Sequence, residues 1–178
     1  MSTLTTIPLP YGLRDVKIFT YTGDTPSVTG VDLPNARTFS FSEAEDFTEL
    51  RGDDGLAAVH GQGPAVDWTL EGGGVSFEAV KAMFGGTITE SGVTPNQVKT
   101  YAKTRTDQRP YFKVVGQAIS DSGGDFHVEL NKARCTGELT GELSDGNFWL
   151  TGAKGRALPD SSGDLYSFIQ NETETPIA

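Results

Sequence analysis

Residues 66–86 read VDWTLEGGGVSFEAVKAMFGG, and this stretch decides the expected fold. Its first six residues alternate between apolar and polar side chains, which is the period-two pattern of a strand with one buried face. We therefore expect a strand whose apolar set belongs to the core and whose polar set points outward. The apolar set is Val66, Trp68 and Leu70, and the polar set is Asp67, Thr69 and Glu71.

Three glycines interrupt this strand, and the residues after them carry the pattern of a short helix at about 76–84. Ser76 can cap the N-terminus, and Glu78 lies in the first turn, where the helix dipole favours a negative charge. A glycine pair follows, as is typical of a helix C-terminus. One apolar stripe runs along this helix, so it is expected to pack on a sheet. The stripe consists of Phe77, Val80 and Phe84.

The remainder of the chain is interpreted as strands and turns. Residues 38–47 place Phe39 and Phe41 on one side of a strand, toward the core. Within residues 49–61, an Asp-Gly pair predicts a hairpin turn, because glycine accepts a positive φ without steric cost. Further strands are expected at residues 16–21, in a hairpin of 111–120 with 126–130, in a hairpin of 135–143 with 148–154, and in two short segments, 87–89 and 97–103.

These elements predict a mainly β protein, an antiparallel sandwich or barrel-like fold with one flanking helix. The high glycine content, 22 residues, agrees with many turns. A length of 178 residues fits one domain spanning 1–178. We expect an extended N-terminal arm at about residues 1–13 and a short polar tail at about 171–178.

The charge of the chain argues against binders of phosphate and of anionic membranes. The formal net charge is −10, and no basic block is present. Neither a secretion signal nor an apolar run long enough to span a bilayer is visible. The single cysteine, Cys135, excludes an internal disulfide, and His60 and His127 are too isolated for a zinc site.

No catalytic motif is visible, so neither enzymatic activity nor a cofactor is expected. The glycines at 72–74 lie between strand and helix but lack both the lysine of a phosphate loop and the dinucleotide pattern. Neither histidine lies near a nucleophile motif. The acidic residues are spread over several strands, as on a charged sheet face, whereas glycoside hydrolysis needs one convergent pair.

Residues 38–86 as a whole resemble a known family. The segments that carry the likeness are FSEAE from Phe41, ELRGDD at 49–54, the V-x-W-x-L-E-x-G-G-x-S passage from Val66, and the helix ending in a glycine pair. The stretch resembles the major tail tube proteins of long-tailed, siphovirus-type bacteriophages, particularly those of actinobacterial hosts.

The resemblance implies a structural virion protein that assembles into hexameric rings, and these rings stack into the tail tube through which the genome is ejected. The implied partners are other copies of the chain, the tape measure protein, the tail terminator and the distal tail proteins, with no membrane partner. Viral DNA would pass without specific binding. The implied location is the virion tail, after synthesis in the host bacterial cytoplasm. Some members carry an immunoglobulin-like decoration domain at the C-terminus, and we expect this chain to be too short for one.

Within that family, two sets of residues become candidate functional sites. Carboxylates facing the channel would repel phosphate and let DNA slide. We expect the hairpin and both arms to contact neighbouring subunits. The candidate channel residues are Asp67, Glu71, Glu43 and Glu45, although Glu43 and Glu45 share the parity of Phe39 and Phe41 unless a bulge shifts the register. The candidate hairpin residues are Glu49, Arg51, Asp53 and Asp54.

A second class of function remains open on the sequence alone. A β-sandwich carbohydrate-binding module stacks sugars on exposed aromatic rings, and Trp68 and Trp149 would be those platforms.

Overall fold

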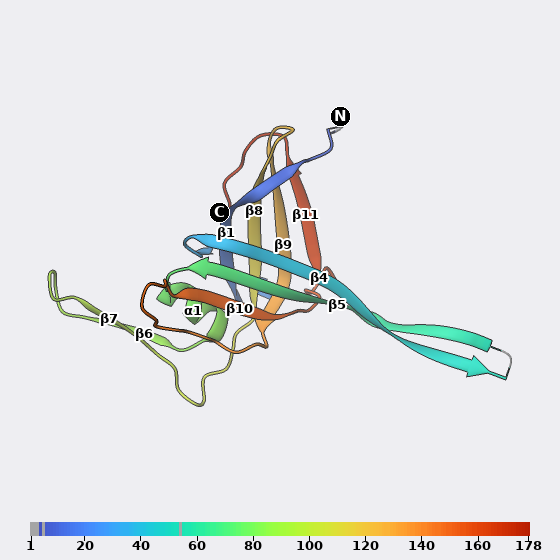
Figure 1. Ribbon diagram of the computed structural model, residues 1–178, viewed down its shortest axis with the longest axis horizontal. Helices are drawn as coiled ribbons and strands as arrows, with labels where there is room; N and C mark the ends of the chain where they lie inside the picture. Colours follow the sequence, from blue (N-terminus) through green and yellow to red (C-terminus); the bar gives the residue numbers. More distant parts are fainter. Residues whose placement is uncertain (1–3, 5, 54) are drawn as a thin grey trace.

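The computed structural model describes residue 4, residues 6–53 and residues 55–178. Figure 1 shows strands in two layers, one helix, and two hairpins that project from the body. The elements are β1 (Pro10–Thr22), β2 (Thr25–Pro26), β3 (Val31–Asp32), β4 (Ala36–Gly52), β5 (Gly55–Gly73), α1 (Phe77–Phe84), β6 (Thr87–Ser91), β7 (Val98–Ala102), β8 (Phe112–Ser120), β9 (Asp125–Cys135), β10 (Leu150–Ala157) and β11 (Tyr166–Asn171). The predicted mainly β, antiparallel fold with one helix is confirmed.

One strand connects the two layers. β9 pairs with β8 on one edge, while its other edge pairs first with β11 and then, over its last three residues, with β10. Strands β1, β8, β9 and β11 form one layer, and β10, β5 and β4 continue the sheet as the second. In Figure 1 the second layer crosses the first at a steep angle.

The core lies between these layers and under α1. Val66, Trp68 and Leu70 of β5 are buried, and the rings of Trp68 and Phe112 meet edge to face at 5.6 Å across the layers. On β4, Phe39 and Phe41 are half-buried and pack against this core.

The helix begins and ends close to the expected residues. The Ser76 side chain accepts a hydrogen bond from Ala79 N, and Gly85 follows the last turn with a φ of 79°. Of the predicted stripe, Val80 and Phe84 are buried, whereas Phe77 is half-buried beside Tyr101. The buried face of the helix is nevertheless wider than this stripe, because further side chains are buried beside it. Other buried side chains of the helix are Ala79, Ala82 and Met83.

The predicted hairpin of residues 135–143 with 148–154 is wrong. Cys135 is the last residue of β9, residues 136–149 contain no strand, and β10 pairs along residues 66–73 of β5. This long-range pairing prevails because β10 covers the second edge of the buried strand β5, which a local hairpin would leave open.

The predicted arm and tail are shorter than expected, because strands take part of each. β1 already begins at Pro10, inside the expected arm. The expected tail begins at the last residue of β11, and Ile177 within it is only 6% exposed. The short segments near 87 and 97 form β6 and β7, a separate two-stranded hairpin.

Gly116 of β8 lies directly against the Phe39 ring of β4, which belongs to the other layer. A Cβ atom at this position would meet Cδ1 of Phe39 at 2.5 Å. We expect Gly116→Ala to lower the free energy of unfolding by about 1–3 kcal/mol, the usual cost of overpacking. Urea unfolding followed by tryptophan fluorescence measures this change.

Gly152→Ala is the matched control, because a Cβ atom there has open space around it. It adds the same methyl group to β10 and should leave stability unchanged or slightly higher. If both variants lowered the free energy of unfolding equally, the clash with Phe39 would not be the cause of the loss at position 116.

No helix in the described part of the chain is long and apolar enough to cross a membrane.

Candidate assembly surfaces

The most prominent surface feature is the far part of the β4–β5 hairpin. Along β5, the pairing with β10 covers residues 66–73. Beyond these residues β4 and β5 continue to pair with each other, from Phe47 opposite Gly61 to Gly52 opposite Gly55. We call residues 47–61 the distal hairpin. Figure 1 shows it extending well beyond the sandwich.

The distal hairpin exposes large apolar side chains. An isolated two-stranded ribbon is marginally stable at best, and exposed apolar groups on such an element usually mark an interface. The exposed fractions are 62% for Phe47, 65% for Leu50, 56% for Leu56 and 52% for Val59.

β4 is also the last strand of its sheet. One edge pairs with β5, and no strand pairs with the other edge within the described residues. The edge of a sheet that no strand covers can take on a further strand from a chain that comes alongside.

The predicted hairpin residues lie on this projecting element. Arg51 donates to Glu49 Oε2 at 2.8 Å, and Asp53 is exposed beside the turn. Asp54 lies outside the described residues. Their contact with neighbouring subunits stays a prediction.

The structure divides the four candidate channel carboxylates between two faces. Asp67 and Glu71 point away from the core, because they alternate with the buried residues of β5. Glu43 lies opposite Val66 and therefore on the core face of β4, where its Oε2 accepts a hydrogen bond from the Tyr166 hydroxyl at 2.7 Å. Glu45 Oε1 accepts from Gly63 N at 3.3 Å.

Cations neutralise the outward pair. Arg156 of β10 lies opposite Asp67 and donates to its Oδ1 at 2.8 Å, and Arg37 lies 3.8 Å from Glu71. Lys154 occupies the same outward face opposite Thr69. Sequence reasoning missed Arg156 and Lys154 because the register between β5 and β10 joins residues almost 90 positions apart. The channel assignment stays a prediction, but this face carries both signs of charge.

A second polar cluster lies on the other layer, around a buried carboxylate. Asp125 is fully buried and accepts from Gln117 Nε2 at 2.5 Å, Asn171 Nδ2 at 2.7 Å and Thr175 N at 2.9 Å. His127 Nε2 lies 3.1 Å from the same carboxylate. Burial acts to raise the pKa of Asp125, but these hydrogen bonds outweigh it and hold the pKa below its usual value.

This cluster anchors residues 172–178, which we call the C-terminal strap. Ile177 packs against Phe19 and Val115, and Lys17 Nζ donates to Ile177 O at 2.7 Å. The Asp125–His127 pair is therefore covered by the strap, and its hydrogen bonds serve to hold that strap.

The carbohydrate-platform interpretation of Trp68 is wrong. Trp68 is 2% exposed and Trp149 is half-buried on the segment before β10. A stacking platform needs an open ring face, and Trp68 instead contacts Phe112 inside the core.

The remaining candidate chemistry is structural. Cys135 is buried, and burial raises its pKa to about 12, so the thiol is unreactive at neutral pH. In the part of the chain that the structure describes, no three His, Cys, Asp or Glu side chains gather as a metal site would require.

Comparisons with known proteins identify no family for this chain. No protein-family model matches it. No curated protein matches it either. Nine chains of solved structures match. One is the cryo-EM structure of the anti-feeding prophage cap, the AFP tube terminating cap. That match has 12% identity and a TM-score of 0.49, covering 96% of this chain and 97% of the other. A likeness at this level carries no conclusion about function.

Proposed function

We propose that this chain is a structural virion protein that assembles into hexameric rings, and that these rings stack into the tail tube of a siphovirus-type phage. The proposal takes the family from the sequence resemblance of residues 38–86. The observation that carries it is the distal hairpin, which exposes four large apolar side chains beside the free edge of β4.

The distal hairpin and the outer edge of β4 both gain stability from contact with a second chain. A ribbon of this kind gains buried area only by packing on another chain, and an edge strand gains backbone hydrogen bonds in the same way. In the proposed assembly both features pack on a different surface of the next copy, so the contact is of the head-to-tail type. Head-to-tail contacts generate rings when the rotation closes, and filaments when it does not.

Removing the distal hairpin tests the proposal. We expect a variant with residues 47–61 replaced by Asn-Gly to fold as the parent does but to form no rings or tubes. The parent should form both, as seen by negative-stain microscopy and by sedimentation at increasing protein concentration.

The circular dichroism spectrum and unfolding midpoint of the variant serve as its folding control. A control of the same kind replaces residues 92–97 between β6 and β7 by Asn-Gly, which shortens the other projecting hairpin. A parent chain that stays monomeric at every concentration, or a truncated chain that still assembles, would overturn the proposal.

A further inference from the structure

Five lysines and arginines that make no ion pair with the described residues lie at the end of β9, on β10 and in the loop before β8, beside a face that also carries Asp67 and Glu71. Arg109 donates to the carbonyls of Cys135 and Gly137, and the Gly137 amide donates to the carbonyl of Lys154. Lys103 and Arg109 also both contact Phe84. We call this surface the basic patch. Its members are Lys103, Arg105, Arg109, Arg134 and Lys154.

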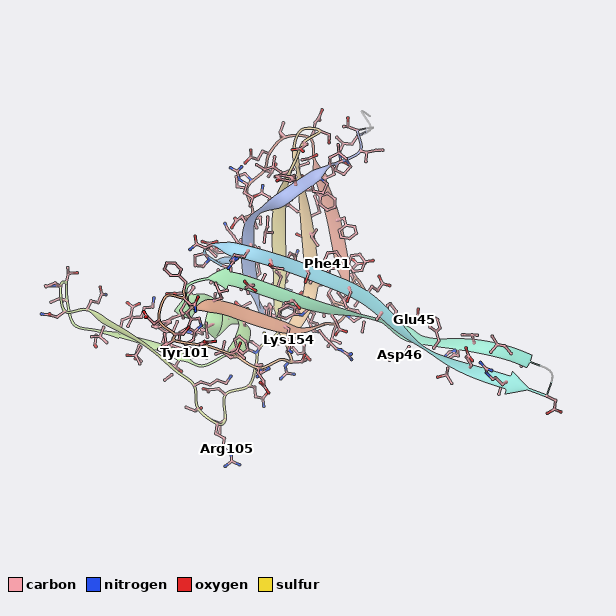
Figure 2. All side chains as sticks on the ribbon, in the orientation of Figure 1. Phe41, Glu45, Asp46, Tyr101, Arg105 and Lys154 are labelled. Atoms are coloured by element: carbon pink, nitrogen blue, oxygen red, sulfur yellow. The ribbon has the colours of Figure 1, made fainter. Side chains whose placement is uncertain are left out.

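The cations of the basic patch differ in how far their charged groups are engaged. The guanidinium of Arg109 donates to backbone carbonyls, and that of Arg134 lies 5.1 Å from the Tyr111 ring centroid. In contrast, Arg105 and Lys154 are exposed and make no ion pair with the described residues. Figure 2 shows Arg105 at the tip of the loop before β8 and Lys154 on β10. The two side chains lie apart in Figure 2, but unpaired positive charges on one surface still raise the association rate of an oppositely charged partner.

The chain itself carries a surface of the opposite sign. Residues 43–54 contain six carboxylates and one cation, Arg51, which is already bound to Glu49. Glu45 and Asp46 lie where the hairpin leaves the sandwich (Figure 2). The hairpin therefore has excess negative charge as well as exposed apolar side chains.

The two surfaces of one chain are too far apart to meet. Lys154 pairs with Thr69, whereas Glu45 lies opposite Pro64, five residues away along β5, roughly 17 Å at the rise of an extended strand. The turn at Gly55 is 14 residues away, roughly 45 Å. The distal hairpin also points away from the sandwich. Its complement must come from a different molecule.

We propose that the basic patch receives the acidic hairpin of a second copy of this chain. The inference rests on the proposed function and adds the acceptor surface to it. Each copy offers its hairpin to one neighbour and its patch to another, so the contact repeats from copy to copy. Charge selects the partner, and the apolar hairpin side chains supply the buried area.

A charge-reversal pair tests this contact. One variant carries Glu45→Lys and Asp46→Lys, and the other carries Arg105→Glu and Lys154→Glu. Each reversal places like charges opposite one another, so we expect each variant alone to assemble at least about tenfold more weakly than the parent. Sedimentation at low and moderate salt measures assembly.

Mixing the two variants supplies the decisive result. In an alternating assembly, each reversed hairpin meets a reversed patch and each parental hairpin meets a parental patch. An equimolar mixture should therefore regain assembly, as should a chain with all four substitutions. Lys81→Glu and Asp121→Lys make the same charge changes on exposed positions outside both surfaces and should assemble normally.

The outcomes separate this inference from the proposed function. If the parent assembles and the reversals have no effect, or if mixing restores nothing, the inference fails while the tube proposal stands. If the parent never assembles, both fail. If the parent retains duplex DNA on a filter and Arg105→Glu with Lys154→Glu abolishes only that retention, the patch binds nucleic acid and the inference is overturned.

Discussion

We expect Asp125→Ala to lower the free energy of unfolding by about 2–3 kcal/mol and to release the C-terminal strap. The substitution removes the acceptor of the half-buried Asn171 side-chain amide and of the Thr175 amide, and it leaves the buried Gln117 amide with only the carbonyl of Thr175, which belongs to the released strap. A buried donor that loses its partner costs about 1–3 kcal/mol, and partly exposed donors cost less because water replaces the acceptor. Urea unfolding gives the stability, and hydrogen exchange of the Thr175 amide reports the strap.

Asp121→Ala is the control, because Asp121 is an exposed carboxylate in the turn just before Asp125. Its stability should stay within about 0.5 kcal/mol of the parent. Unchanged protection of Thr175 in Asp125→Ala would show that the carboxylate does not hold the strap.

The same residue sets an acid limit on stability. The folded pKa of Asp125 lies below the ordinary value of 3.8, so the folded state binds its proton less readily than the unfolded state does. Its stabilising contribution is complete above the unfolded pKa and is lost as pH falls through the folded one. In Asp125→Asn, stability should decline less steeply below about pH 4 than in the parent. If the stability of Asp125→Asn fell as steeply with falling pH as that of the parent, Asp125 would not be the group that limits stability in acid.

Trp68→Ala should cost about 3–5 kcal/mol, the usual loss for truncating a large buried aromatic side chain. Trp68 joins the two layers through its contact with Phe112, so the cavity would open between sheets that cannot easily close over it. Thermal and urea unfolding measure the loss.

Trp149→Ala is the matched control on a half-buried tryptophan outside the strands. We expect it to cost about 1 kcal/mol or less. A small effect at position 68 together with a large one at 149 would contradict the placement of the core.

Local patterns in the sequence were sufficient for several elements. The alternation at 66–71, the Ser76 cap with its following helix, and the pairing of β4 with β5 on either side of a glycine-containing turn each depend on residues that are close in sequence. Side-chain period, capping and turn chemistry act over a few residues, so these elements can be recognised without knowing what they pack against.

Only the tertiary structure decided which surfaces these elements present. The pairing of β10 with β5 brings Arg156 to Asp67, and the fold-back of the strap brings Thr175 to Asp125, 50 residues away. Likewise, the basic patch draws its members from a loop and two strands. Strand register and chain reversal depend on the free energy of the whole packed core, and no local pattern in the sequence encodes that sum.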